Sequence, residues 1–346
     1  MNNLYNVKKS IYQNIKNIIA KTSALRRGKK IKIVNILAAY NEEDIINYVL
    51  NDFITKNIQV YFIDHHSTDK TSDIVKKYLG KGVTKIETFP EESGYPSELK
   101  DVYAWRYMLK RKEELHSMLG ADWYMHMDAD AILESPWEDV PLVKAIQLVD
   151  MLGYNCIDFE LFNFRPVNGE YDGKTKPQDF FRYWEPDNYD EPQIKCWKNF
   201  GQNIDLVSSG GHIVEFEGKK VFPVKFIMKH YPIRGREHGI KKIFAERLPR
   251  YDKNERDMHW HTQYDRHLVE KDIKFSKRDL LEYDDNLVKQ IYLPLLNCLN
   301  ILEKKDKIVK EKDRLITSIY FSRSWKIGRF LTTPWRWMKK ILLRKE

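Results

Sequence analysis

Two apolar runs near the start of the chain are each followed by a polar turn and then by a helical pattern. The run IKIVNILAAYNEED (residues 31–44) leads into DIINYVLNDFITKN, where apolar residues recur at helical spacing. The run IQVYFIDHHSTDKT repeats this order, with Asp64 at the end of its apolar part. Strand, helix, strand, helix predicts an α/β fold with a parallel sheet. Ligands bind at the carboxyl ends of such strands, so the YNEE turn and Asp64 are candidate binding positions.

A third strand-like segment, ADWYMHMDADAILES (residues 121–135), carries Asp128 and Asp130 on either side of an alanine. Two carboxylates this close repel each other and are costly to desolvate. A divalent metal ion would relieve the repulsion, because side chains at i and i+2 can share one ion through hard oxygen ligands. Such an ion can also stabilise a nucleotide diphosphate as a leaving group.

Charge is distributed unevenly along the chain. The sequence has a net charge of +9, yet residues 1–32 contain nine Lys and Arg and no acidic residue, and residues 304–346 contain fourteen against four. The body between them is therefore acidic, whereas a nucleic-acid-binding domain carries its positive charge on the folded body. We expect no nucleic-acid partner. Three widely spaced cysteines argue against a disulfide framework and suit a reducing cytoplasm.

Both basic ends show amphipathic features. Isoleucines recur at helical spacing among the lysines of residues 1–30, and Trp325, Trp335 and Trp337 stand among basic residues near the end of the chain. We expect a basic amphipathic helix over 1–30 and a helical, basic, membrane-surface tail over 286–346, which could hold the protein at an anionic membrane. The alternative is that both are ordinary helices packed on the body. Neither end has the apolar length that a membrane span requires.

The ordered segments AAYNEED, VYFIDHHSTDKTSDIV and DWYMHMDADAILES resemble the motifs of family 2 glycosyltransferases of the GT-A fold, over residues 31–136. The later SSGGH, KHYPIRGREHG and WHTQYD look like a bacterial branch that acts on surface polysaccharides. This resemblance implies a GT-A (Rossmann-like) domain over residues 31–285, with a mostly parallel central sheet flanked by helices and followed by a C-terminal helical appendage. Residues 165–205, rich in Pro, Asp, Gly and aromatics, are expected to form long loops.

The resemblance also implies roles for individual residues. Tyr40 and Glu42 would lie by the nucleoside, Asp64 would accept a hydrogen bond from the base or ribose, and Asp128 and Asp130 would serve the ribose and the metal-bound diphosphate. One departure concerns the usual Asp-Asp-Gly turn, where this chain has His65 and His66 after the first Asp. A residue other than glycine limits positive φ, so we expect a differently placed loop, and base preference stays open.

A late histidine is a further candidate metal ligand. His230 ends an apolar strand-like segment, and some GT-A enzymes add such a histidine to the metal. Imidazole suits Mn²⁺ better than Mg²⁺. Inverting transfer needs a base for the acceptor hydroxyl, and the usual Glu-Asp pair has no obvious counterpart here. Asp205 and His212 are the first candidates for this base, and Glu237 is the alternative.

The leading hypothesis is a metal-dependent, inverting glycosyltransferase of bacterial cell-surface polysaccharide synthesis. A UDP-sugar is the expected donor, and a glycan or lipid-linked molecule is the expected acceptor. The expected location is cytoplasmic, peripheral at the inner face of the cell membrane. Two alternatives stay open: a sugar-phosphate nucleotidyltransferase, which would normally have a glycine-rich basic loop where this chain has AAYNEED, and a non-enzymatic membrane-surface or nucleic-acid binding protein.

Overall fold

The structure is a computed structural model that describes residues 31–186, 192–252, 255, 273, 275–297, 307, 310–312 and 314. The chain divides into two compact units, Met1–Leu293 and Pro294–Glu346. In the second unit, residues 294–297, 307, 310–312 and 314 are helical. The helix expected over 1–30 and most of the tail expected over 286–346 lie outside the described residues. Within the described part of the chain, no helix has both the length and the apolar character needed to cross a bilayer.

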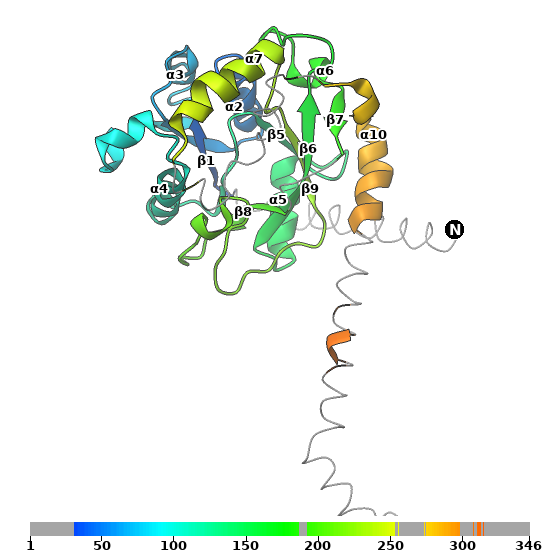
Figure 1. The fold of residues 1–346 in the computed structure, drawn as a ribbon. Coiled ribbons are helices and arrows are strands. Elements are labelled where there is room, and N and C mark those ends of the chain that lie inside the picture. Colours follow the sequence, from blue (N-terminus) through cyan, green and yellow to red (C-terminus); the bar gives the residue numbers. More distant parts are fainter. Residues whose placement is uncertain are drawn as a thin grey trace, which may run out of the picture. The chain divides into compact units, whose positions relative to one another are not determined.

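The first unit is built on one mixed sheet of ten strands (Figure 1). The strands are β1 (Ile33–Ala39), β2 (Gln59–Asp64), β3 (Val83–Thr88), β4 (Trp123–Met125), β5 (Ala131–Glu134), β6 (Cys156–Arg165), β7 (Tyr183–Glu185), β8 (Gln193–Lys198), β9 (Phe226–His230) and β10 (Leu281–Glu282). The main path through the sheet is β10-β7-β6-β8-β4-β1-β2-β3, and β9 pairs with both β5 and β6.

Helices flank this sheet (Figure 1). The α-helices are α2 (Ile46–Thr55), α3 (Thr71–Lys76), α4 (Trp105–Met118), α5 (Leu142–Met151), α6 (Pro177–Phe180), α7 (Arg236–Ile240) and α10 (Asp285–Leu287). The 3₁₀ and π helices are η1 (Glu91–Ser93), η2 (Ser97–Asp101), η3 (Val207–Ser209), η4 (Lys241–Arg247), η5 (Leu248–Arg250), η7 (Lys277–Asp279) and η8 (Val288–Tyr292). The predicted α/β architecture, a central sheet flanked by helices, is confirmed.

The half of the sheet nearest the N-terminal motifs is parallel. β1 lies between β2 and β4 and runs parallel to both, and β2 runs parallel to β3. The central strands are almost wholly buried, as expected for a parallel sheet covered on both faces. Parallel pairing brings the carboxyl ends of β1, β2 and β4 to one edge, which places their polar turns side by side.

The other half of the sheet is largely antiparallel, and here the sequence prediction needs correction. Residues 165–205 were expected to be long loops, but they contain α6, β7 and β8. β8 lies between β4 and β6 and pairs antiparallel with both. It therefore joins the parallel half of the sheet to the antiparallel half. The mostly parallel sheet implied by the resemblance is therefore a mixed one.

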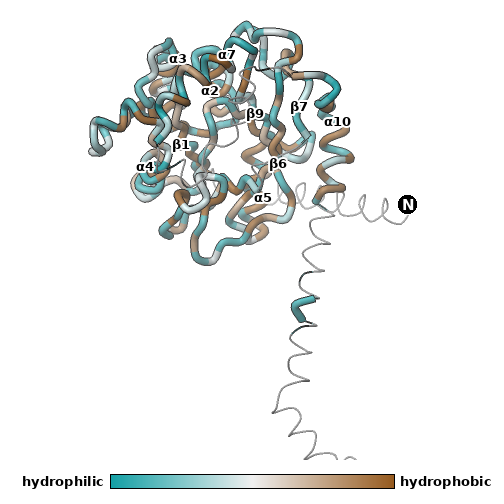
Figure 2. Tube along the Cα trace, viewed as in Figure 1, coloured by the Kyte–Doolittle hydropathy of each residue, from teal (hydrophilic) through white to brown (hydrophobic). Residues whose placement is uncertain are grey.

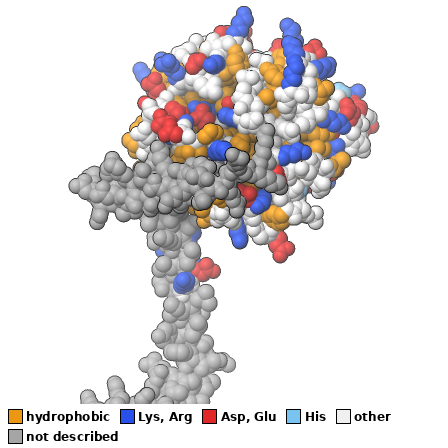
Figure 3. Space-filling model, turned by 180° about the vertical axis from the view of Figure 1, so that it is seen from behind, with side chains coloured by type: hydrophobic (Ala, Val, Ile, Leu, Met, Phe, Trp, Pro, Cys, Tyr) orange, Lys and Arg blue, Asp and Glu red, His pale blue; other side chains and the backbone are white. Residues whose placement is uncertain are grey.

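The core follows from this arrangement. Side chains such as Ile36, Phe62, Trp123 and Trp197 are fully buried, and each such burial stabilises the fold by roughly 1.5–3 kcal/mol. Hydrophilic and hydrophobic residues are interspersed along the tube of the first unit (Figure 2). On the face seen in Figure 3, Lys and Arg side chains are interspersed with Asp and Glu over the described surface.

Candidate active site

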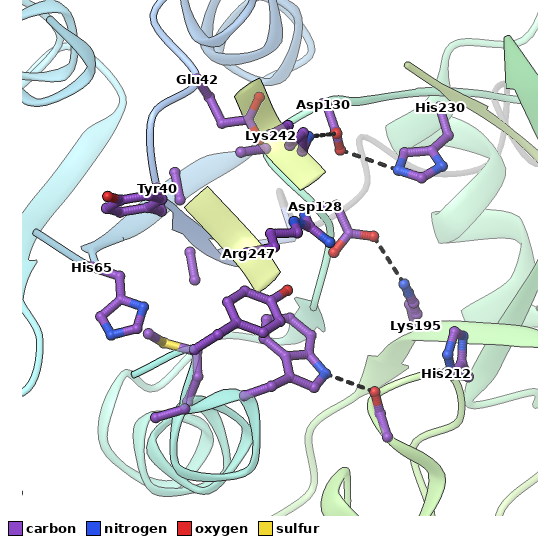
Figure 4. Close-up of a pocket in the computed structure, with 18 of the residues that line it drawn as sticks. Tyr40, Glu42, His65, Asp128, Asp130, Lys195, His212, His230, Lys242 and Arg247 are labelled. Carbon is purple, nitrogen blue, oxygen red and sulfur yellow. Dashed lines mark hydrogen bonds and ion pairs between the residues drawn. The ribbon is translucent and has the colours of Figure 1, made fainter. Parts of the chain in front are cut away.

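A cavity of about 360 Å³ opens at the carboxyl ends of β1, β2 and β4 (Figure 4). One wall is made by the turn after β1, including Tyr40, and by His65 after β2. Asp128 and Asp130 lie between β4 and β5 and form the centre. The remaining walls come from the start of α4, from β6, β8 and β9, from the loop before His212, and from the helices η4 and η5. The edge of the sheet that was predicted to bind a ligand therefore contains a cavity.

The turns after β1 and β2 are joined by side-chain hydrogen bonds. Asn41 has a φ of 55°, in the left-handed region that Asn tolerates better than most residues. Its carboxamide oxygen accepts from the backbone N–H of Thr68 at 2.7 Å, and Thr71 Oγ1 accepts from the N–H of Glu42 at 2.8 Å. Polar side chains of YNEED and STDKT thus accept hydrogen bonds from the backbone N–H groups of the other turn. These bonds fix Glu42 at the cavity.

The second turn corrects one expectation. His66, which stands where the usual pattern has glycine, adopts a φ of 59°. The loop therefore takes the left-handed conformation that its non-glycine residue was expected to limit. His66 is partly exposed, and its Nε2 lies 2.6 Å from Glu91 Oε2.

The Asp-x-Asp segment is held by β1. Asn35 is buried on β1, and its Oδ1 accepts from the backbone N–H of Met127 at 3.1 Å. Ala38, at the end of β1, forms a parallel bridge with Asp128. These contacts extend the β1–β4 pairing to the two aspartates and direct them to the strand ends.

Asp130 is buried among cationic and imidazole groups. Lys242 Nζ lies 3.1 Å from Asp130 Oδ2, and His230 Nε2 lies 3.2 Å from Oδ1. Burial alone would raise the pKa of Asp130, but the nearby Lys242 and His230 side chains outweigh it and hold that pKa well below the usual value. Asp130 is therefore ionised at neutral pH.

Asp128 has a different partner. Its side chain is 31% exposed to the cavity, and Lys195 Nζ on β8 lies 3.1 Å from its Oδ2. Burial would raise the pKa of Asp128, but Lys195 and His230 lower it below the usual value. The two aspartates therefore have different cationic partners: Lys195 neutralises Asp128, and Lys242 neutralises Asp130.

A second group of charges lies behind the cavity wall. Arg234 is fully buried and donates to Glu42 at 2.5 Å and to Asp44 at 2.7 and 2.8 Å. Within the described ranges, Glu42, Asp44 and His238 are the set whose possible ligand atoms lie within 4.8 Å of one another. The Arg234 guanidinium already supplies the positive charge between these carboxylates, so the cluster does not fit a metal ion.

Asp130 and His230 fit a divalent ion better. His230 donates from Nδ1 to Asn163 Oδ1 at 2.7 Å, which directs Nε2 at Asp130 Oδ1. Their 3.2 Å separation is close to the roughly 3 Å expected between neighbouring ligands of an ion with bonds of about 2.1 Å. A carboxylate oxygen with an imidazole nitrogen is a donor set that suits Mn²⁺.

The SSGGH segment places His212 against β8. Gly211 has a φ of 91°, and a Cβ there would lie 2.8 Å from His126 Nε2 and 2.9 Å from Leu109 Cδ2. Glycine is therefore required for this close approach. The backbone N–H of Ile194 donates to the His212 carbonyl at 2.8 Å, and Gln193 Nε2 donates to His212 Nδ1 at 2.9 Å.

The structure brings most of the sequence-predicted residues together. Six of them line the cavity, namely Tyr40, Glu42, Asp128, Asp130, His212 and His230. The other three do not line it. Asp64 is buried at the end of β2 with its Oδ1 accepting from the Ser67 N–H, Asp205 accepts from Ser208, and Glu237 is exposed on α7.

Several residues of the cavity were missed at the sequence level. Gln193 and Lys195 come from β8, inside the segment expected to be loops, although the alternation in QIKCWK is typical of a strand. Arg247 and Arg250 come from η4 and η5, which the sequence analysis did not connect with the site. Arg250 lies 3.9 Å from the centre of the Tyr40 ring, within cation–π range.

Residues 35–97 match the family model of Glycosyl transferase family 2. The resemblance inferred from the motifs is confirmed over this segment. The chain is also 32% identical over 124 residues to the Poly(ribitol-phosphate) beta-N-acetylglucosaminyltransferase TarS of Staphylococcus aureus, in strains Mu50 and MW2. This match covers 33% of the chain and 21% of TarS, so the chain spans far less than two thirds of the relatives' length.

Two solved structures are also similar. S. aureus TarS 1-349 in complex with UDP has a TM-score of 0.35 and 16% identity, covering 72% of this chain and 74% of that one. Glucosyl-3-phosphoglycerate synthase from Mycobacterium tuberculosis, in complex with phosphoglyceric acid, has a TM-score of 0.26 and 19% identity, covering 41% and 48%. Because both TM-scores lie below 0.5, the fold assignment rests on the strand order described above.

Proposed function

We propose that the chain is a glycosyltransferase that moves a sugar from a nucleotide-sugar donor to a glycan or lipid-linked acceptor in bacterial cell-surface polysaccharide synthesis. The observation that carries this proposal is the pair Asp128 and Asp130 at the centre of a cavity formed by the ends of β1, β2 and β4. Most of β1 and all of β2 lie within the segment that matches the glycosyltransferase family. Ligands of α/β sheets bind at this edge.

The charges of the cavity suit a nucleoside diphosphate. Lys195 and Lys242 neutralise the two aspartates, and Arg247 and Arg250 add positive charge to the same walls. Transfer breaks the bond between the sugar and the diphosphate, so negative charge develops on the leaving phosphate. Cations fixed in the cavity stabilise that charge without reorganising during the reaction.

A divalent ion would be held by Asp130 and His230, with Asp128 beside it. When bound, it would supply Lewis-acid stabilisation of the leaving diphosphate. Asn163 holds the His230 ring by the hydrogen bond from Nδ1, as second-layer partners of metal ligands commonly do.

His212 is the proposed base for the acceptor hydroxyl, because it faces the cavity while Asp205 and Glu237 do not. Asp128 also faces the cavity, but its lowered pKa makes it a weak base. In the observed orientation Gln193 donates to His212 Nδ1, which places the ring proton of neutral His212 on Nε2. Proton acceptance at Nε2 therefore requires the Gln193 amide to turn over.

The turn after β1 disfavours the nucleotidyltransferase alternative. A phosphate-binding loop would present backbone N–H groups and basic residues, yet here Glu42 occupies the turn and pairs with Arg234 and Lys242. We also propose a cytoplasmic location at the inner face of the membrane, supported by the basic, amphipathic sequence of the two ends. The division into a helix over 1–30, a transferase domain over 31–285 and a tail over 286–346 belongs to the same proposal.

The test is nucleoside diphosphate release from a panel of UDP-, GDP-, dTDP- and CDP-sugars with Mn²⁺, with and without lipid-linked glycan acceptors. We expect slow release with one donor, loss of release in Asp130→Asn, and acceleration by the right acceptor. Absence of release from every donor, together with absence of nucleotide binding, would exclude the proposed function.

A further inference from the structure

His65 occupies a place in the cavity wall that the sequence pattern assigns to its neighbour. Asp64 ends β2, but its carboxylate turns back to the N–H of Ser67 at 3.1 Å and does not line the cavity. His65 is the residue of this turn that does line it. The backbone N–H of His65 donates to the Ala39 carbonyl at 3.0 Å, so the residue is fixed between the ends of β1 and β2.

The protonation of the His65 ring follows from its contacts. Nε2 lies 2.9 Å from the backbone carbonyl oxygen of Leu99. A carbonyl oxygen can only accept a hydrogen bond, so Nε2 carries the ring proton and Nδ1 is left with a lone pair. Burial lowers the pKa of His65 to about 4, so the ring is neutral at pH 7.

Nδ1 is available to a ligand. Among the described residues, none makes a hydrogen bond with this atom, although His65 as a whole is only 5% exposed. The ring is held in place by Phe89, whose ring centre is 5.6 Å away at an angle of 76°. The wall therefore presents a rigid hydrogen-bond acceptor, and leaving it unpaired in a filled cavity would be costly.

The surroundings of His65 suit a nucleoside. The Tyr40 ring centre is 6.4 Å from that of His65, and the two lie together in Figure 4, away from Lys195 and His212. Tyr40 and the Arg250 guanidinium above it offer flat surfaces on which a planar base can stack. Asp128 and Asp130 then lie toward the diphosphate.

We propose that His65 Nδ1 reads the base of the donor by accepting a hydrogen bond from a ring N–H. This inference rests on the proposed function and specifies its substrate class. Uracil and thymine carry such a donor at N3, and guanine carries one at N1. Cytosine and adenine present a lone pair at the corresponding positions, which would face the lone pair of Nδ1. A site built around one hydrogen-bonding group rejects ligands that lack its partner.

The test is isothermal titration of the full chain, with Mn²⁺, using UDP, GDP and CDP and the N-methylated probes 3-methyl-UDP and 1-methyl-GDP. We expect UDP or GDP to bind about tenfold or more tightly than CDP and than its own methylated form. Methylation removes the N–H and changes little else at the phosphates.

Two substitutions of His65 distinguish the roles of its two ring nitrogens. In His65→Gln, the amide nitrogen can still donate to the Leu99 carbonyl, but the acceptor at the Nδ1 position is lost. The preference for UDP over 3-methyl-UDP (or GDP over 1-methyl-GDP) should fall to about twofold or less. In His65→Asn, the amide oxygen takes the place of Nδ1 and should keep a preference. His66→Asn is the matched control, because Asn tolerates the positive φ at this partly exposed neighbour.

The outcomes separate the two proposals. If wild-type protein binds none of the nucleotides, the proposed function fails and the inference fails with it. If it binds them without distinguishing the methylated probes, or if His65→Gln keeps the full preference, the inference is overturned while the proposed function stands.

Discussion

The ammonium group of Lys242 lies 3.1 Å from Asp130 Oδ2 and 3.0 Å from Glu42 Oε1. One buried cation therefore joins the acidic turn after β1 to the Asp-x-Asp segment after β4. The pKa of Lys242 is raised overall, because the two carboxylates outweigh the effect of burial. Together with Lys195, which pairs with Asp128, this contact explains how the chain holds two neighbouring carboxylates near a strand end.

Removing this cation should cost stability. In Lys242→Met, Glu42 and Asp130 stay buried and lose the ammonium group that they share, so we expect a loss of about 3 kcal/mol in the free energy of unfolding. Lys241→Met is the control, because Lys241 is 58% exposed and its contact with Glu246 should contribute less than about 0.5 kcal/mol. Urea denaturation of both variants measures the difference. Equal midpoints would show that Lys242 carries no buried charge pair.

The three candidate bases give different predictions. His212→Ala should lower kcat by about 10²-fold or more, as expected when a general base is removed. Asp205→Asn and Glu237→Gln should stay within about threefold of wild type, because neither residue reaches the cavity. Steady-state transfer rates with the active donor measure all three. A large loss of kcat in Asp205→Asn, with normal folding, would assign the base to that residue.

Gln193 gives a second check on His212. In Gln193→Glu, a carboxylate would replace the amide that now donates to Nδ1 at 2.9 Å. The ring proton of His212 should then move to Nδ1, leaving Nε2 as the acceptor, and the pKa of His212 should rise. We expect the acidic limb of the kcat profile to move to higher pH relative to wild type. An unchanged profile would contradict the proposed role of His212.

The burial of Lys112 leads us to expect an unusual pH dependence of stability. Its ammonium group is buried, lies 2.7 Å from His126 Nδ1, and has its pKa lowered from 10.5 to about 7 by burial. Between these values the unfolded chain binds a proton that the folded protein does not. The free energy of unfolding should therefore rise with pH above 7, by about 1.4 kcal/mol per unit at most.

Urea unfolding at pH 7, 8 and 9 checks this dependence. Lys112→Met should flatten the curve, while Lys110→Met, on the same helix but less buried, should keep the wild-type slope. A wild-type curve that falls over this range, or a Lys112→Met curve that keeps the full slope, would show that Lys112 stays charged in the folded protein.

Much of the parallel half of the fold could be predicted from the sequence. The apolar runs that form β1 and β2 are long and nearly continuous, and each is followed by a short polar turn. Both the strands and the ligand-binding edge of the sheet could therefore be predicted. Six of the nine predicted site residues line the cavity for this reason. Asp128 and Asp130 could be predicted for the same reason, because they come just after the apolar segment that forms β4.

The rest of the site depends on long-range pairing. Lys195 reaches Asp128 because β8 pairs with β4 across more than sixty residues of sequence, and no local pattern sets that pairing. The partners of Asp130 come from β9 and η4, again distant in sequence. Asp64 and His65 differ for another reason: a one-residue step at a strand end reverses which side chain faces the cavity.

The most direct test of the account is whether nucleotide sugars stabilise the folded protein through the Asp-x-Asp site. Thermal unfolding with Mn²⁺ and each of UDP-, GDP-, dTDP- and CDP-sugars should show a concentration-dependent rise in Tm with one donor class in wild-type protein. The shift should be much smaller in Asp128→Asn, measured against the variant's own Tm. No rise with any donor, or an equal rise in Asp128→Asn, would contradict a donor site at these aspartates.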